Sequence, residues 1–270
     1  MEAVIIIGAV LFVLFALYLV MLKPKRASGL KEFTAVRYAH RGLHRDGAAE
    51  NSMSAFRLAV ERGYGIELDV RLSSDGVPVV FHDDTLDRVT GKSGRVNQYT
   101  AAELSEIKLS GTDDGIPTLL DVLSLVSGRV PLLVEIKEDA GDSCVSTEAA
   151  RILSGYNGPY IVESFNPLSL RNFGKALPAV PLGILSHKYM KYEKYRKPLY
   201  YILQIMLLNR IAGVSFVAYD HSHRSFSLWL LRRLFGAVTF AFTVRSKKEE
   251  KEAKKRGFDT VIFEGYEPKD

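Results

Sequence analysis

The chain begins with a continuous apolar run. Residues 3–22 are uncharged and mostly apolar, and as a helix they would extend about 30 Å, the thickness of the hydrocarbon core of a bilayer. A cleavable secretory signal is the alternative. However, no basic side chain precedes the run, and Lys-Pro-Lys-Arg at 23–26 occupies the place of a cleavage site. We therefore expect residues 1–26 to be a retained transmembrane anchor with a basic flank.

All the basic residues near this apolar run lie after it, at Lys23, Lys25 and Arg26. Basic residues beside a membrane-spanning helix favour the cytoplasmic side. The sequence thus predicts a single-pass membrane protein whose folded domain is cytoplasmic. Residues 27–33 are expected to form a linker, and residues 34–270 one large domain, since α/β domains commonly reach this length undivided.

After the linker, short β-like apolar runs alternate with segments of helical character. The expected strands are 34–39, 67–70, 132–136, 160–165, 182–185, 213–217, 239–244 and 260–263. Eight strands with helices between them predict an α/β fold, a (β/α)8 barrel closed by parallel pairing. Residues 79–81 would then be an antiparallel excursion and not a barrel strand.

Polar residues indicate where several helices begin. Asn51 or Ser52 can cap a helix that runs to about residue 62. Thr100 with Glu103 fits a capping box, and Thr118 is expected to cap a further helix. Residues 85–99, rich in Gly, Ser and Asn, predict a loop.

Charged and apolar side chains alternate in the strand around Glu67. Glu67 and Asp69 share one face, and Leu68 and Val70 share the other. Paired carboxylates are unfavourable in a core but suit a hard cation such as Mg²⁺ or Ca²⁺. Glu135 in a later strand would supply a third carboxylate.

Asp75-Gly76 between two β-like runs is a strong hairpin signal. A two-residue loop would place Ser74 opposite Val77. The same register would place His82 opposite Asp69, beside the paired carboxylates.

Taken together, six fragments resemble the glycerophosphodiester phosphodiesterase family between about residues 36 and 138. The fragments are His-Arg-Gly at 40–42, Glu-Asn-Ser at 50–52, Glu-Leu-Asp at 67–69, the Asp-Gly to His-Asp stretch at 75–83, Ile-Pro-Thr-Leu at 116–119 and Glu-Ile-Lys at 135–137. The resemblance implies a TIM barrel with a short cap over its mouth, and one divalent cation, Mg²⁺ or Ca²⁺.

The resemblance also implies roles for particular residues. His40 and His82 would be the acid and base, Arg41 and Lys137 would bind phosphate, and Glu67, Asp69 and Glu135 would bind the metal. Histidine suits proton transfer because its ordinary pKa lies near neutrality. Glu50 either places favourable charge at a helix N-terminus or makes a hydrogen bond within the site.

The resemblance weakens near the end of the chain. The family's tryptophan and asparagine are replaced by Phe242 and Arg245, and its final aspartate by Glu264. Phe242 would contact the site only from a second layer. These departures leave the alcohol part of the substrate open.

Composition limits the kinds of partner and the class of protein that we expect. The net charge of +5 and pI near 9.1 suit anionic surfaces or substrates, but no nucleic-acid-binding motif accompanies the charge, so we expect no nucleic acid partner. A single cysteine, Cys144, excludes an internal disulfide and counts against the disulfide-bearing sphingomyelinase-type phospholipases D. The sequence leaves protein partners open.

Two basic segments have structural interpretations as well as functional ones. Residues 188–197, followed by the apolar 199–208, favour a solvated turn that leads into a barrel helix. The alternative is a segment that lies in the membrane interface. Residues 247–256 predict a solvated helix face.

Three functions follow from the resemblance and from these alternatives. The first is metal-dependent hydrolysis of glycerophosphodiesters to glycerol phosphate and an alcohol. The second is lysophospholipase D action on lysophospholipids at the membrane. The third is a non-catalytic, membrane-tethered adaptor that binds phospho-headgroups.

Overall fold

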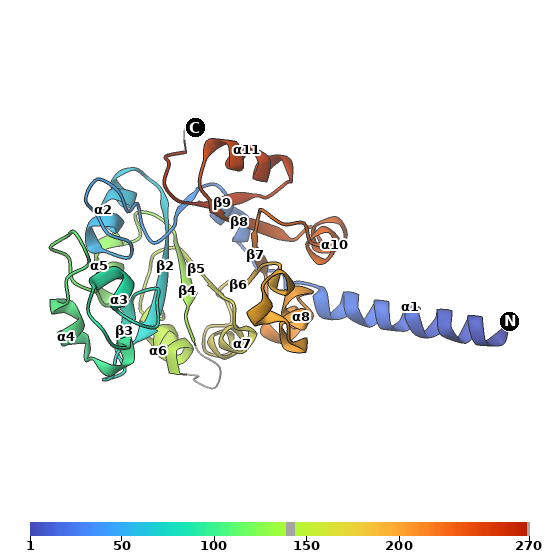
Figure 1. Cartoon of the computed structure of the whole chain (residues 1–270). Helices are drawn as coiled ribbons and strands as arrows, with labels where there is room; N and C mark the ends of the chain where they lie inside the picture. Colours follow the sequence, from blue (N-terminus) through green and yellow to red (C-terminus); the bar gives the residue numbers. More distant parts are fainter. Residues whose placement is uncertain (139–143, 269–270) are drawn as a thin grey trace.

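Eight parallel strands form a closed barrel in the computed structural model, which describes residues 1–138 and 144–268 (Figure 1). The barrel closes because β1 pairs in parallel with both β2 and β9. The predicted (β/α)8 barrel is therefore confirmed. Its strands are β1 (Tyr38–Ala39), β2 (Gly65–Leu72), β4 (Leu132–Ile136), β5 (Tyr160–Ser164), β6 (Leu182–Ser186), β7 (Phe216–Asp220), β8 (Val238–Val244) and β9 (Thr260–Phe263).

Helices surround this barrel, and all but one of them bury apolar side chains against it; the exception, at 198–204, has no buried residue. They are α2 (Met53–Glu61), α5 (Leu119–Val126), α6 (Cys144–Leu153), α7 (Pro167–Ala176), α8 (Pro198–Gln204), α9 (Asn209–Ala212), α10 (Phe226–Phe235) and α11 (Lys247–Lys255). The Oγ of Ser52 accepts the N–H of Ala55 at 3.1 Å and thus caps α2. Thr118 caps α5 through a capping box with Asp121. Both capping predictions hold.

The first barrel strand is shorter than predicted. Instead of a strand over 34–39, residues Leu30–Thr34 form a 3₁₀ helix, η1, and only Tyr38–Ala39 are β. Leu30 is buried in the same apolar cluster as Tyr38, Phe216 and Phe240 from inside the barrel. Burial of Leu30 therefore favours a helical turn over 30–34, most of which was predicted to be a linker.

The sixth barrel strand, β7, begins three residues later than predicted. Gly213 has a left-handed backbone (φ 71°) and ends α9, so 213–217 is not the strand. The strand covers Phe216–Asp220, which moves its C-terminal end to Asp220.

The hairpin has a different register from the one predicted. Strand β3 (Pro78–Val80) pairs antiparallel with β2, with Val80 opposite Val70, so Phe81 and not His82 is opposite Asp69. The loop has three residues, 74–76, because the N–H of Ser73 already donates to the carbonyl of Val77 at 3.1 Å. Gly76 takes the left-handed conformation (φ 76°) that such a loop requires.

Residues 81–118 form a cap with an apolar cluster of its own. The cap contains α3 (Asp87–Thr90), the 3₁₀ helix η2 (Val96–Gln98) and α4 (Ala101–Glu106), which begins at the predicted capping box of Thr100 and Glu103. The prediction of a loop over 85–99 is thus wrong in part. The apolar cluster includes Phe81, Leu86, Val89, Leu104 and Ile116, and it keeps these short elements together.

One helix in the described part of the chain is long and apolar enough to cross a membrane. It is α1 (Glu2–Leu22), whose apolar stretch has a mean hydropathy of 3.0 and is not buried in the protein. Only its C-terminal end packs on the domain. Leu22 is buried, and the hydroxyl of Tyr18 donates to the carbonyl of Ile205 at 3.1 Å and lies 2.8 Å from the Oγ of Ser227. The rest of α1 projects away from the barrel (Figure 1).

Candidate active site

Three buried carboxylates meet at the C-terminal ends of two neighbouring barrel strands. Glu67 and Asp69 belong to β2, and Glu135 belongs to β4, where it is the register partner of Asp69. One ligand oxygen of each lies within 4.8 Å of the others. Barrels of this type carry their chemistry at this end. The structure therefore brings together the three residues that were predicted to bind metal.

These carboxylates repel one another in a buried environment. Burial, together with the charges of Asp69 and Glu135, raises the pKa of Glu67 well above its ordinary value. Burial also raises the pKa of Glu135 to about 7, against the opposing effect of Lys137. For Asp69 burial acts upward too, but Lys137, His82 and Arg41 together hold its pKa well below the usual range. Such a cluster favours a bound cation.

Two basic side chains border the carboxylates. Nζ of Lys137 lies 2.7 Å from Oε1 of Glu135 and 3.1 Å from Oδ1 of Asp69. Nε of Arg41 lies 3.4 Å from Oδ2 of Asp69, and the backbone N–H of Arg41 donates to Oε2 of Glu67 at 2.8 Å. Arg41 and Lys137 thus place two positive charges beside three carboxylates.

Each predicted catalytic histidine has its Nδ1 next to a carboxylate. His40 Nδ1 lies 3.0 Å from Oε2 of Glu264, and His82 Nδ1 lies 2.6 Å from Oδ1 of Asp83. Burial lowers the pKa of His40, and burial lowers that of His82 to about 4. With Nδ1 engaged, Nε2 is the nitrogen that each ring can offer to a ligand.

His82 reaches the site although its predicted register is wrong. The chain leaves β3 after Val80, and Nε of Arg71 donates to the carbonyl of His82 at 2.9 Å. The charge of Asp69 acts on the pKa of both His82 and His40. Both rings therefore lie close to the carboxylates.

Glu50 connects the site to the cap. Its Oε1 accepts a hydrogen bond from Nη1 of Arg41 at 2.8 Å. Arg88 of α3 donates to both oxygens of Glu50, at 2.6 and 2.9 Å, and to Oδ2 of Asp83 at 2.6 Å. Arg88 was not singled out in the sequence, because its partner Glu50 lies 38 positions before it.

Two further buried residues complete the surroundings of the carboxylates. Nδ2 of Asn51 donates to Oδ2 of Asp69 at 2.9 Å, whereas the sequence suggested only a helix cap for Asn51. Glu163 on β5 is the register partner of Glu135. Glu163 shares a strand face with Ile161, opposite to that of Val162, and a carboxylate on this apolar strand was the signal that could have identified it.

Phe242 lies farther from the carboxylates. Its ring meets that of Phe165 edge to face at 6.0 Å, and Nζ of Lys137 lies 6.0 Å from the centre of the Phe165 ring. Arg245 stands where the family usually has an asparagine. Its Nη2 donates to Oε2 of Glu264 at 3.0 Å. Arg245 and His40 therefore share one carboxylate.

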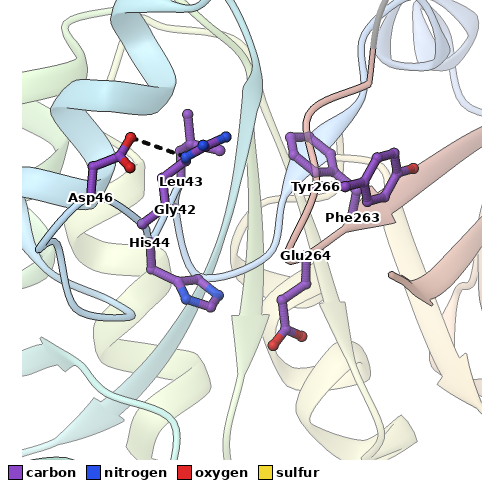
Figure 2. A pocket seen from close by; sticks show the side chains of 9 residues that line it. Gly42, Leu43, His44, Asp46, Phe263, Glu264 and Tyr266 are labelled. Atoms are coloured by element: carbon purple, nitrogen blue, oxygen red, sulfur yellow. Dashed lines mark hydrogen bonds and ion pairs between the residues drawn. The ribbon is translucent and has the colours of Figure 1, made fainter. Parts of the chain in front are cut away.

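A small cavity of about 160 Å³ is lined by residues 42–46 and 263–266 (Figure 2). The side chains of His44 and Glu264 point into the same space. Glu264 belongs to this cavity and also accepts from His40, so the cavity opens next to the imidazole. His44 is a polar group that the sequence did not single out.

Residues 40–266 match the sequence profile of the glycerophosphoryl diester phosphodiesterase family. This match covers most of the chain and all the site residues described in this subsection. The chain belongs to the glycerophosphoryl diester phosphodiesterase family. The resemblance given by the six sequence fragments is confirmed.

Among relatives of this family, a glycerophosphodiester phosphodiesterase from Caldanaerobacter subterraneus is 36% identical over 161 residues, which are 54% of this chain and 65% of that protein. One from Bacillus altitudinis is 33% identical over 163 residues, which are 55% of this chain and 65% of the relative. The matched segments thus span slightly less than two thirds of these relatives.

Solved structures of this family share the barrel. A glycerophosphodiester phosphodiesterase from Thermotoga maritima has a TM-score of 0.66 and 27% identity, with 84% of this chain and 94% of that chain covered. A phosphodiesterase from Oleispira antarctica, solved with the product sn-glycerol-3-phosphate, has a TM-score of 0.71 and 23% identity, with 86% and 94% covered. The latter similarity concerns the fold.

Proposed function

We propose that this family member hydrolyses glycerophosphodiesters to glycerol phosphate and an alcohol. The observation that carries the proposal is the set of three buried carboxylates flanked by Arg41, Lys137 and two histidines at one end of the barrel. Basic residues can bind a phosphodiester, and histidines can move protons at neutral pH. The named activity of the relatives and the product held by the Oleispira antarctica structure support the same substrate class.

Glu67, Asp69 and Glu135 fit one divalent cation, Mg²⁺ or Ca²⁺. Their oxygens lie within 4.8 Å of one another, and burial raises the pKa of Glu67 and Glu135. An all-oxygen donor set of this kind matches a hard cation. When bound, the cation would polarise the phosphoryl oxygens and gather negative charge.

In the proposed reaction, His40 and His82 divide the proton transfers. One takes the proton from the nucleophile that attacks phosphorus, which is water in a direct hydrolysis, and the other protonates the leaving alkoxide. Glu264 and Asp83 hold the Nδ1 atoms and thereby aim Nε2 of each ring. Arg41 and Lys137 neutralise the charge that grows on the phosphoryl group.

A lysophospholipid is the second candidate substrate, and α1 is the observation that favours it. A helix that spans the bilayer would hold the barrel next to single-chain lipids.

We propose a single-pass membrane protein whose basic flank, Lys23, Lys25 and Arg26, keeps the barrel on the cytoplasmic side.

Phosphorus NMR of the full chain in detergent tests these proposals. The protein is incubated with glycerophosphocholine, glycerophosphoethanolamine or lysophosphatidylcholine, with Mg²⁺ or Ca²⁺ and then with EDTA. Glycerol phosphate that stops forming after chelation supports the glycerophosphodiesterase. Lysophosphatidic acid would assign lysophospholipase D instead.

Absence of any product at all metal concentrations would leave the headgroup-binding adaptor. The matched control is Glu67→Gln, which removes one proposed ligand charge and is expected to abolish the chelator-sensitive signal. Equal product from this variant and the parent protein would contradict the metal site.

A further inference from the structure

Exposed apolar side chains gather where α1 leaves the domain. Most of the large exposed apolar residues outside α1 lie on α8, α9 and α10, and α1 packs against α9. Six of them, which we call the root face, are Leu199, Tyr201, Ile211, Phe226, Trp229 and Leu234, each 46% to 64% exposed. Figure 1 shows α8 and α10 beside the base of the projecting helix. An apolar face of this kind indicates a binding surface.

The chemistry of the root face suits a membrane interface. The rings of Phe226 and Trp229 stack at 5.8 Å on the exposed side of α10, and tryptophan favours the headgroup level of a bilayer. Residues 188–235, which include these helices, carry nine Lys and Arg side chains and only two acidic ones, Glu193 and Asp220. Basic residues next to exposed apolar ones attract anionic lipids.

A pocket of about 440 Å³ opens within this region, between α1, α8 and α10. Its apolar wall includes Phe15 of α1 and Phe226 of α10, and Lys188 and Arg224 line it from the loops after β6 and β7. Neither cation forms an ion pair with an acidic side chain in the part of the chain that the structure describes. The pocket thus combines two uncompensated positive charges with an apolar surface.

We propose that the root face rests on the bilayer surface and that this pocket binds the headgroup of an anionic bilayer phospholipid. Lys188 and Arg224 receive the phosphate, and the acyl chains run along the apolar side of α1 near Phe15. Charge complementarity and continuity with α1 identify the occupant. The inference rests on the membrane-spanning α1 of the proposed function and is independent of the hydrolytic chemistry.

Such binding would fix the orientation of the barrel as well as its distance from the membrane. Lys188 follows the last residue of β6 by two positions, and Arg224 follows that of β7 by four. Both therefore lie at the end of the barrel that holds the carboxylates. The bound lipid would keep this end beside the bilayer.

The chain's single tryptophan, Trp229, provides the test. The full chain is placed in nanodiscs of phosphatidylcholine and phosphatidylglycerol, with the phosphatidylglycerol either plain or brominated in its acyl chains. Bromine quenches a tryptophan only at close range. The control is Trp229→Phe combined with Leu120→Trp, since Leu120 on α5 is equally exposed but lies across the barrel.

We expect brominated lipid to quench Trp229 at least about twofold more than the Leu120→Trp reporter. The double variant Lys188→Gln and Arg224→Gln should lose at least half of that excess, whereas Lys247→Gln with Lys251→Gln on α11 should keep it. Equal quenching of the two reporters would overturn the membrane face. Equal quenching of Trp229 in the parent protein and in the Lys188→Gln, Arg224→Gln variant would overturn the headgroup site.

Two readouts separate this proposal from the others. Resistance of the protein to carbonate extraction reports whether α1 is inserted, and hydrolysis of glycerophosphocholine in the same nanodiscs reports the chemistry. Inserted α1 with an unquenched Trp229 contradicts the root face alone. Loss of hydrolysis with normal quenching contradicts the proposed reaction alone.

Discussion

Glu135 and Glu163 are register partners on the adjacent parallel strands β4 and β5, and both carboxylates are buried. Burial and the charges of Glu135 and Glu67 raise the pKa of Glu163 well above its ordinary value. Its Oε2 accepts no hydrogen bond from any residue that the structure describes. This environment therefore favours the protonated, neutral form of Glu163 beside the proposed metal ligands.

Glu163→Gln should leave the enzyme active because the amide has the shape and charge of the protonated acid. We expect kcat/KM for glycerophosphocholine to stay within about threefold, a barrier change below about 1 kcal/mol. The matched variant Glu135→Gln should lose about a hundredfold or more, since it alters a proposed ligand. Equal losses of kcat/KM in Glu163→Gln and Glu135→Gln would contradict the view that Glu135, and not Glu163, is a metal ligand.

Stability of the metal-free protein should depend on the protonation of Glu135. Its folded pKa of about 7 exceeds the value of about 4.3 in an unfolded chain. Between these values the folded state holds a proton that the unfolded state has lost, so this contribution to stability falls as the pH rises. Glu135→Gln has no such proton. Its stability relative to the parent protein should therefore increase from pH 5 to pH 8 in EDTA, as measured by urea unfolding.

Divalent cations should reverse the loss of stability that the metal-free protein shows as the pH rises. Because the ligands must be deprotonated to bind, Mg²⁺ or Ca²⁺ should raise the melting temperature more at pH 8 than at pH 5. Differential scanning fluorimetry against added cation measures both increases. A rise of equal size in Glu135→Gln would show that the cation binds elsewhere.

Replacement of either proposed catalytic histidine should remove most of the activity. We expect His40→Ala and His82→Ala to lower kcat by about 10² to 10⁴ without unfolding the protein. His221→Ala is the matched control, because its ring lies 3.6 Å from Glu249 of α11. Circular dichroism verifies the fold, and near-normal turnover in either alanine variant would refute the assignment.

Arg88 should act on catalysis through its partners. It binds Asp83, which holds His82, and Glu50, which holds Arg41. We expect Arg88→Gln to lower kcat by about tenfold, as for other residues that orient a catalytic group. Without Arg88 the carboxylate of Asp83 acts more strongly on His82 and raises the pKa of that histidine. The acid limb of kcat/KM should therefore move to higher pH.

The control for Arg88 is Arg95→Gln, on the same cap. Arg95 pairs with Asp84, which does not hold His82. We expect this variant to keep the pH profile of the parent protein. A shift of the profile in both variants would mean that the cap as a whole, and not Arg88, sets the pKa of His82.

Several features of this protein follow from sequence because they depend on neighbours along the chain. The alternation of Glu67 and Asp69 with Leu68 and Val70 defines two strand faces in any sheet. Thr100 and Thr118 cap helices through contacts only three residues away. The apolar composition of 3–22 likewise identifies a long exposed helix without knowledge of the fold.

Other features were decided by tertiary contacts. Burial of Leu30 in the barrel cluster gave the helical turn η1 in a segment expected to be mostly linker, and a three-residue loop changed the hairpin register by one position. Alternation predicts which side chains share a face but not the loop length that sets their partners. The sequence pattern therefore placed His82 near the site for a reason that the structure does not support.

By itself the sequence determined the barrel and the family, and it predicted the three carboxylates and the two histidines as site residues. Each of these is a local pattern or a short motif. Only the closed barrel decided that Glu163 lies beside Glu135, that Asn51 donates to Asp69 and that Arg88 connects the cap to the site. These contacts join residues that are 18 to 38 positions apart along the chain or lie on separate strands. Their distances depend on how strands and cap pack, and local periodicity carries no information about that packing.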